Sequence, residues 1–590
     1  MILCDYGIIR QGTRRERGRI VTLQRVSSCF RNMRACTIHL AARALPGLGF
    51  SGLFLIVVLG GACEDQTVIT GTDNPNPTGP MQPSIGTSEP SKNPTLTDPA
   101  QPTTEPTVER PGEAGFPASP TPQLHDPTTD QIVAPDPTIG EDDPPDLPPD
   151  PVSPPPETPT TEPPTPPIPP PTGTFDPTLK VEGFGSATVG GRGGKVFLVT
   201  TLEDSGEGSL RTCVEASGPR YCLFRTGGTI VLQKRLSIED PFITIAGQTA
   251  PGGGITLRTA NGGDTLAIMT SEVILSYLTL RPGPGGENHG AELCRNKNLL
   301  NNLVLDHLSL SWGTDEVLET WYAVEHVTIQ WSLIAEALDC STHPKGCHSK
   351  GVMLGGPRKG EDSEEPGGKL ISFHHNLMAH NGERNPLVKT AGLATVINNV
   401  VYNPYWTFSH VDMEHQLVPV LANYLGNVFI EGPDSEGGKY GIHICNKTPL
   451  GAEIYQTDNL LLRKKGTTLT GQDVVDPDAR PYLVATPHPG DSTTVDAANA
   501  TLELVAREAG NSAALACDGT WYQRRDAIDT RIVESVTSRS GAIIDDPSDV
   551  GGWLAVDPGT PCPDEDADGL PDAYEALHGQ AKLEEYLAGK

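Results

Sequence analysis

The chain has 590 residues, of which 20% are charged and 5% aromatic, and its formal net charge at pH 7 is −31. An acidic chain of this kind disfavours nucleic acid as a partner, because phosphate backbones are bound by clustered Lys and Arg side chains. It also means that an acidic polymer has to be held by local cations or by bound metal.

The first 62 residues predict a leader that is removed on export. Residues 47–62 form an apolar run that follows Arg34 and Arg43 and ends directly before Cys63. This pattern is typical of a signal peptide, and the run is short for a membrane span. The small residues before Cys63 resemble a bacterial lipoprotein cleavage site. We therefore expect a secreted, extracellular protein, either free or anchored to the outer membrane by a lipid on Cys63, with Met33 as an alternative start.

Residues 63–174 have a composition that excludes a packed core. They are dominated by Pro, Thr, Asp and Glu, and residues 64–172 carry 18 acidic but only 2 basic side chains. A segment with so few apolar side chains cannot offset the entropy of ordering its backbone. We expect a disordered, extended tether.

From Lys180 onward the chain consists of short runs rich in β-branched residues, with hardly any helical periodicity. The runs resemble one another and recur about every 20 to 30 residues, which is typical of a solenoid. We predict an all-β fold, a right-handed parallel β-helix over residues 175–540, with a β-sandwich as the alternative. The recurring segments are 273–280, 303–310, 327–334, 371–377, 395–401 and 421–428.

Polar residues recur at a similar place in these segments, where a side chain at the turn between sheets can hydrogen-bond its neighbours. The expected ladder consists of Asp306 or His307, His375, Asn398 or Asn399, and Asn423. His348 and His374 are also assigned to packing rather than catalysis. Trp312 and Trp331 suit either packing or stacking on a sugar ring.

Eight cysteines follow the expected cleavage point, and in an exported chain they indicate disulfides. The expected pairs are Cys213 with Cys222, Cys340 with Cys347, and Cys445 with Cys517. Cys294 and Cys562 are left without an expected partner.

Three segments place charged residues where a solenoid strand turns: 305–319, 348–355 and 373–389. Here the sequence resembles the pectate lyases of polysaccharide lyase family 1, from Gly183 to about Gly432. The Asp-His at 306–307, followed by Asp315 and Glu319, is similar to the family's strand signature. His348 to Gly355 is similar to its lysine segment, and Arg384, Pro386 and Lys389 are similar to its Arg-x-Pro-x-x-Arg motif. Glu319 and Lys389 depart from the usual Asp and Arg.

The resemblance implies a Ca²⁺-dependent enzyme that acts on pectate. It assigns Arg384 as the general base, Lys350 and Lys389 as ligands of substrate carboxylates, and Asp315 and Glu319 as calcium ligands. A third acidic ligand is expected from the preceding coil of the solenoid, and Glu292 is the candidate. We left Glu316 out of this set, because alternation along a strand turns it away from its neighbours.

Arginine is normally protonated and is then a poor base. We expect nearby calcium, Lys350 and Lys389 to lower the pKa of Arg384, because like charges disfavour a second positive charge. Stabilisation of transition-state charge is the alternative role for this residue.

Residues 541–590 form a tail with a second calcium motif. Counted from Asp564, acidic residues stand at positions 1, 3, 5, 9 and 12 with Gly at position 6, which is the spacing of an EF-hand loop. These residues are Asp564, Asp566, Asp568, Asp572 and Glu575. We expect a single loop with a structural role, and a solvated acidic tail is the alternative.

The sequence thus favours a monomeric lyase that cleaves polygalacturonate by β-elimination and leaves 4,5-unsaturated oligogalacturonates. Rival hypotheses are a lyase for methylated pectin or another uronate polymer, and a non-catalytic, calcium-dependent binding or adhesion protein. A glycoside hydrolase needs carboxylates spaced for acid and base catalysis, for which the sequence offers no separate candidates.

Overall fold

The computed structural model describes residues 9–16, 19–26, 180–293, 299–356, 367–414, 417–579 and 582–589. Strands β1 (Ile9–Glu16) and β2 (Arg19–Val26) pair antiparallel. The predicted tether, Cys63 and Cys294 lie outside the described residues. Within those residues, no helix has the length and apolar character that a membrane span requires.

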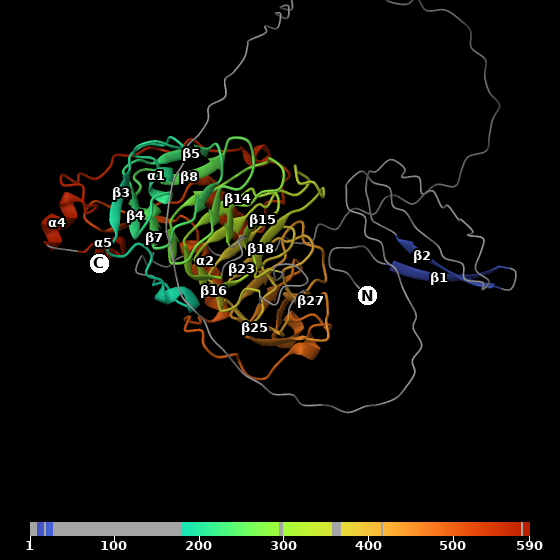
Figure 1. Ribbon diagram of the computed structural model, residues 1–590. Coiled ribbons are helices and arrows are strands. Elements are labelled where there is room, and N and C mark those ends of the chain that lie inside the picture. The colour runs from blue at the N-terminus through green and yellow to red at the C-terminus, as the bar shows by residue number, and fades with distance from the viewer. Residues whose placement is uncertain are drawn as a thin grey trace, which may run out of the picture. The chain divides into compact units, whose positions relative to one another are not determined.

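Three sheets of parallel strands form the main body, and each coil of the chain adds one strand to each sheet (Figure 1). The first sheet contains β3 (Lys195–Val199), β4 (Arg220–Phe224), β7 (Ile243–Ala246), β10 (Val273–Ser276), β13 (Leu300–Asp306), β16 (Val324–Gln330), β19 (Ile371–His374), β22 (Leu393–Ile397), β25 (Val420–Leu425) and β28 (Ala452–Thr457). The second contains β5 (Gly228–Leu232), β8 (Ile255–Thr259), β11 (Thr279–Leu280), β14 (Ser309–Ser311), β17 (Leu333–Ala335), β20 (Leu377–Ala379), β23 (Val400–Tyr402), β26 (Val428–Ile430), β29 (Leu460–Leu462) and the antiparallel β30 (Thr468–Thr470). The third contains β6 (Leu236–Ile238), β9 (Leu266–Ile268), β12 (Ala291–Leu293), β15 (Glu316–Thr320), β18 (Lys350–Leu354), β21 (Leu387–Val388), β24 (Ser409–Asp412) and β27 (Ile442–Cys445).

Apolar side chains at equivalent positions stack from coil to coil inside the solenoid. Leu275 pairs in register with Leu305, which pairs with Ile329, which pairs with Phe373, and all four are fully buried. Fully burying one such side chain stabilises the fold by about 1.5–3 kcal/mol. The parallel β-helix and its repeats are confirmed.

The polar ladder lies between the first and second sheets, one residue away from part of the predicted set. The amide of each member donates to Oδ1 of the next, at 2.9–3.0 Å. The members are Ser332, Asn376, Asn399, Asn427 and Asn459. Asn399 was predicted correctly, whereas Asn423 is wrong because it lies within β25 and bonds the backbone of His488.

The residue before each ladder member has positive φ, and two of these residues, Trp331 and His375, continue an aromatic stack that begins at Tyr277 and His307 in earlier coils. Tyr277, His307, Trp331 and His375 stack with centroid separations of 4.5, 6.1 and 4.2 Å. His307 and His375 therefore pack with aromatic rings instead of joining the amide ladder.

Replacing Asn399 by alanine is expected to lower the free energy of unfolding by about 3 kcal/mol, because it leaves the Asn376 amide and the Phe373 carbonyl buried without their partner. Chemical denaturation measures this change. The exposed Asn261 is the matched control, and its change to alanine should alter stability by less than about 0.5 kcal/mol. Equal stabilities of the two variants would show that the ladder contributes nothing.

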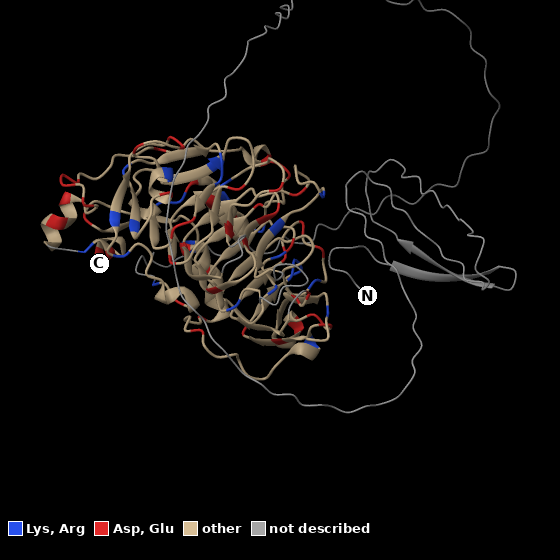
Figure 2. Ribbon diagram, viewed as in Figure 1, with Lys and Arg blue, Asp and Glu red and all other residues tan. Residues whose placement is uncertain are grey.

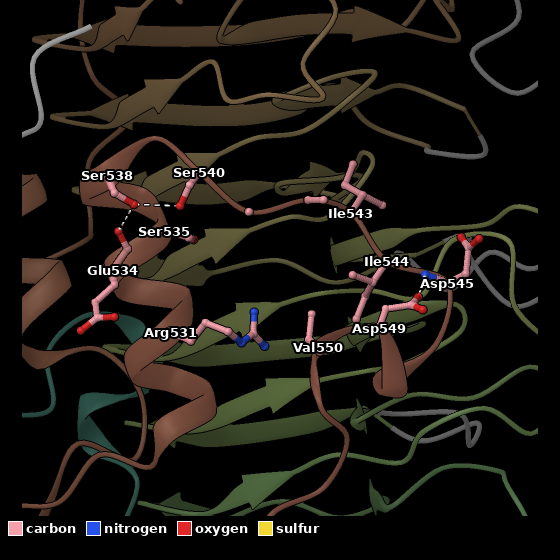
Figure 3. Close-up of a pocket in the computed structure, with 12 residues that line it drawn as sticks. Arg531, Glu534, Ser535, Ser538, Ser540, Ile543, Ile544, Asp545, Asp549 and Val550 are labelled. Atoms are coloured by element: carbon pink, nitrogen blue, oxygen red, sulfur yellow. Dashed lines mark hydrogen bonds between the residues drawn. The ribbon is translucent and has the colours of Figure 1, made fainter. Parts of the chain in front are cut away.

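Several helices were not expected from the sequence. They are α1 (Leu210–Val214), α2 (Ala498–Glu508), α3 (Ala527–Ser538), α4 (Asp572–His578) and α5 (Leu583–Leu587), with 3₁₀ turns η1 (Phe184–Ala187), η2 (Gly247–Thr249), η3 (Gly471–Val474), η4 (Arg480–Tyr482) and η5 (Pro547–Val550). A short hairpin of β31 (Ala513–Leu515) and β32 (Trp521–Gln523) lies between α2 and α3. Apolar residues of α2 and α3 pack on the second sheet. Figure 3 shows a pocket between α3 and the segment that returns through Ile544.

Two of the three predicted disulfides are confirmed, Cys213–Cys222 and Cys340–Cys347. The third prediction is wrong: Cys517 pairs with Cys562 because the C-terminal segment folds back, and Cys445 is a buried free thiol.

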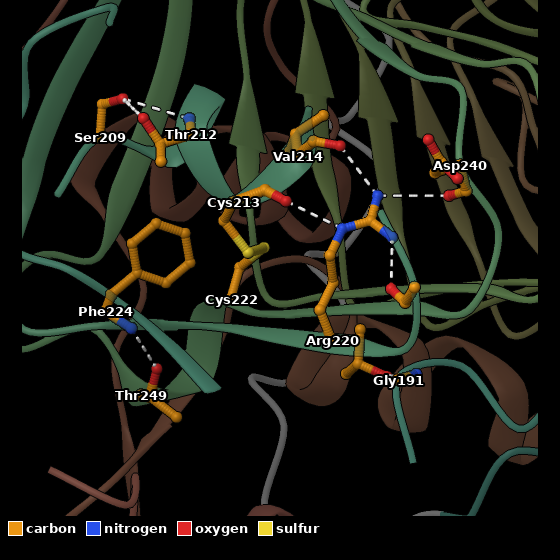
Figure 4. The surroundings of a disulfide bond; sticks show 12 residues. Gly191, Ser209, Thr212, Cys213, Val214, Arg220, Cys222, Phe224, Asp240 and Thr249 are labelled. Atoms are coloured by element: carbon orange, nitrogen blue, oxygen red, sulfur yellow. Dashed lines mark hydrogen bonds between the residues drawn. A yellow bond between two sulfur atoms is a disulfide. The ribbon is translucent and has the colours of Figure 1, made fainter. Parts of the chain in front are cut away.

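Beside the first disulfide, buried Arg220 donates to the backbone carbonyls of residues 213, 214, 218, 240 and 241 (Figure 4). Burial lowers the pKa of Arg220.

Candidate active site

Two predicted calcium ligands lie on neighbouring strands of the third sheet. Glu292 of β12 pairs in register with Glu319 of β15, so that the preceding coil supplies the first of them as expected. Both residues are buried, with 0% and 2% of their surface exposed. Parallel strands in register thus bring together two carboxylates that are 27 positions apart in the sequence.

His289 lies at the centre of this carboxylate group. Its Nδ1 is 2.9 Å from Asp264 Oδ1, and its Nε2 is 3.5 Å from Glu319 Oε1 and 4.0 Å from Glu316 Oε2. Burial lowers the pKa of His289, but Glu319, Asp264 and Glu316 together raise it to about 10. An imidazolium therefore supplies positive charge within the group.

Arg235 contributes a second positive charge. Its Nη1 lies 3.2 Å from Asp264 Oδ2 and 3.0 Å from Glu292 Oε2. Burial raises the pKa of Asp264, yet the hydrogen bond and charge of His289, with the charge of Arg235, give a net lowering. The Asp264 carboxylate is therefore held in its charged form.

Asp315 makes its direct contacts with a different pair of residues. Its Oδ1 lies 2.8 Å from His348 Nε2, and its Oδ2 lies 3.5 Å from Nε2 of His343, whose ring stacks on His348. Burial raises the pKa of Asp315, but the hydrogen bond and the positive charge of His348 hold it well below its usual range. Asp315 thus borders the group through Glu316 without sharing a cluster with Glu319.

Glu316, which the predicted set does not include, lies beside the carboxylate group. It is the first residue of β15, where the alternation of the strand has only begun. Its carboxylate forms an ion pair with Arg384 and also faces His289. Glu316 therefore joins the acidic group to the predicted base.

The three predicted cationic residues converge on the next coils. Lys350 begins β18 and pairs with Glu383, and Lys389 Nζ lies 3.3 Å from Asp412 and 3.4 Å from Glu414. Their side chains are 8% and 10% exposed, and that of Arg384 is 17% exposed.

The backbone brings β24 and β18 next to the segment that carries Arg384 and Lys389, since the His410 amide donates to the Pro386 carbonyl and the Val352 amide donates to the Arg384 carbonyl. Burial lowers the pKa of His410 well below the usual value, and the positive charges of Arg384, Lys350 and Lys389 lower it further, together with that of His443. The outer side of the third sheet therefore carries carboxylates on β12 and β15 and cations on and beside β18 and β21. Figure 2 shows acidic and basic residues intermixed on this part of the solenoid.

The carboxylate group has the donor chemistry of a calcium site. Asp264, Glu292, Glu316 and Glu319 offer oxygen atoms, which are the ligands that Ca²⁺ takes. They occur in two clusters, Asp264 with Glu292 and Glu316 with Glu319, and His289 belongs to both. Within each cluster the ligand atoms lie within 4.8 Å of one another. The residues present therefore fit an oxygen-bound divalent cation.

Several other residues of the predicted set lie away from this site. Trp312 and Trp331 are buried, with 0% and 6% exposure, which supports packing. The acidic residues of the C-terminal loop lie beside β4, since Asp564 pairs with Arg225. Asp264, His289 and Glu383 were not predicted from the sequence, and Glu316 was considered there but excluded. Only Glu383 had a local signal, because it directly precedes Arg384.

No protein-family model matches the chain. It is 34% identical over 418 residues to a protein of Aspergillus flavus named probable pectate lyase C, with 68% of this chain and 86% of that protein covered. A Neosartorya fischeri protein of the same name is 32% identical over 410 residues, with the same coverage. The crystal structure of jun a 1, the major allergen from cedar pollen, is 20% identical with a TM-score of 0.40, covering 56% of this chain and 92% of that one.

The chain's relatives are named as pectate lyases, and pectate lyases are polysaccharide lyases, so the chain is a polysaccharide lyase. Because 34% identity extends over more than two thirds of the chain, it belongs to the pectate lyase family, as the sequence motifs indicated.

Proposed function

We propose that the chain is a calcium-dependent pectate lyase that cleaves polygalacturonate by β-elimination. The observation that carries this proposal is the ion pair between Arg384 and Glu316, which lies where the carboxylate group borders the cationic group. This boundary places a basic side chain beside a site suited to an oxygen-bound cation.

Arg384 is the residue that removes the proton from C5 of a galacturonate unit. The electrons of the C5–H bond form a double bond between C4 and C5, and the bond from C4 to the glycosidic oxygen breaks. That oxygen takes a proton from water, and the hydroxide that remains takes the added proton back from Arg384. Glu316 favours the charged guanidinium. The base role therefore requires that substrate binding separates the Glu316–Arg384 ion pair, and a charged Arg384 would instead stabilise negative charge in the transition state.

Lys350 and Lys389 bind substrate carboxylates in this proposal. Each is already paired with acidic side chains, so an incoming uronate exchanges one anionic partner for another. Such an exchange avoids leaving a buried ammonium without a counter-ion. It also favours an acidic polymer over a fully methylated one.

Glu292, Glu316, Glu319 and Asp264 would hold the calcium ion, and Asp315 adjoins Glu316 in the chain. When bound, calcium would neutralise the substrate carboxylate next to C5 and so make the C5 proton more acidic. His289 and Arg235 balance the charge of the acidic group. We further propose that the enzyme acts outside the cell, as a monomer, and is either free or lipid-anchored.

The test is an assay of the purified chain on polygalacturonate, in which near-ultraviolet absorbance follows the unsaturated product. We expect product with calcium, none with a chelator, and a slower reaction on highly methylated pectin. A folded chain that binds polygalacturonate in a calcium-dependent way without forming product would establish the non-catalytic alternative. Faster cleavage of methylated pectin would identify a pectin lyase.

A further inference from the structure

The C-terminal acidic loop brings together residues that the proposed reaction does not use. Asp564, Asp566 and Asp568 each offer a carboxylate oxygen within 4.8 Å of the others. Asp572 begins α4, so that the helix leaves the loop at position 9. Figure 2 shows the acidic residues gathered on α4 and on the loop before it.

Glu575 stands at position 12, in the first turn of α4 together with Asp572. The 12-residue segment thus carries five carboxylates, of which those of Asp564, Asp566 and Asp568 converge. Like charges at this density repel one another unless a cation lies between them.

Asp564 provides an observation independent of the loop spacing. Its side chain is 2% exposed, its Oδ2 pairs with Arg225 and accepts from the Gly569 amide at 3.2 Å, and its Oδ1 is buried without a hydrogen-bond partner. A buried carboxylate oxygen without a donor is costly and rare in native structures. A metal ion satisfies such an atom directly.

The loop lies against the first coils of the solenoid. A Cβ on Gly569 would come within 2.7 Å of Leu223 Cδ1, so the loop backbone closely approaches β4. After α4, Glu584 accepts a hydrogen bond from Tyr221 at 2.6 Å, and Leu583 and Leu587 pack near Leu223. Figure 1 shows α5 beside β3 and β4.

We propose that this loop is a second calcium site, separate from the catalytic one, and that the bound ion fixes the C-terminal segment onto the first coils. The ligands are the side chains of Asp564, Asp566, Asp568 and Glu575, with Asp572 at the position that often acts through water. An all-oxygen set without His or Cys selects Ca²⁺ over zinc or copper. This site does not depend on the proposed enzymatic activity.

The test counts calcium ions bound by the full chain in equilibrium dialysis and follows hydrogen exchange of residues 564–589. The double variant Asp566→Asn/Asp568→Asn should lose one bound ion, and exchange in this segment should become at least about tenfold faster. Both residues are exposed, so the rest of the fold should persist. Glu565→Gln is the matched control, because it changes an exposed carboxylate at a non-ligand position and should keep the ion.

A second variant separates this site from the catalytic one. Glu292→Gln/Glu319→Gln should retain the loop ion and the calcium-dependent protection of residues 564–589. The proposal is overturned if the loop variant binds as many ions as the original chain, or if calcium leaves exchange in the segment unchanged. Failure of the lyase assay would not affect either readout.

Discussion

Replacing Arg384 by alanine is expected to lower kcat on polygalacturonate by about 10³-fold, the range in which a general base contributes. KM should change much less, because Lys350 and Lys389 remain to bind substrate carboxylates. Initial rates of unsaturated product formation at saturating calcium and varied substrate measure both constants.

Arg463 provides the matched control for this substitution. It forms a comparable ion pair with Glu431, and its side chain is 16% exposed, against 17% for Arg384. Arg463→Ala should leave kcat unchanged. Arg384→Lys separates base catalysis from charge stabilisation, since lysine keeps a positive charge for Glu316. If Arg384→Ala retained most of the original kcat, Arg384 would have no catalytic role.

Changing Glu319 to glutamine is expected to raise the calcium concentration needed for half-maximal activity by about 100-fold, because metal affinity follows the number of charged ligands. At saturating calcium much of the activity should return. The measurement is the rate of product formation across a calcium titration.

The control for Glu319 is Glu325→Gln. Glu325 lies in β16 of the first sheet and pairs with Lys369 at 3.2 Å, away from the acidic group of the third sheet. The calcium dependence of the Glu325→Gln variant should equal that of the original chain. An unchanged calcium titration for Glu319→Gln would remove this residue from the metal site.

The repeats were predictable because each coil buries apolar side chains at the same positions, so the apolar pattern recurs along the sequence. The register of the turn was harder to predict. Neighbouring polar and aromatic residues such as His375 and Asn376 occupy consecutive turn positions, and only the backbone φ angle separates their roles. A shift of one residue therefore placed part of the ladder in the aromatic stack.

A residue of the candidate site could be predicted where it lies in a short sequence motif. It could not be predicted where it belongs to another coil and has no such motif. Glu319 and Arg384 were identified from local sequence, and Glu292 was inferred by asking which coil precedes β15. His289 and Asp264 come from turns whose proximity depends on loop lengths. The same limit explains the Cys517–Cys562 disulfide, which requires the chain to fold back on itself.

The contacts between the C-terminal segment and β4 have a consequence for the order in which the chain folds during synthesis. Coils can add one after another as the chain emerges, because each contacts mainly its predecessor. Tyr221 and Arg225, however, meet their partners only 363 and 339 residues later. This face of the first coils therefore stays uncovered until residues 564–584 have been synthesised, and a chain terminated before them would leave it exposed permanently.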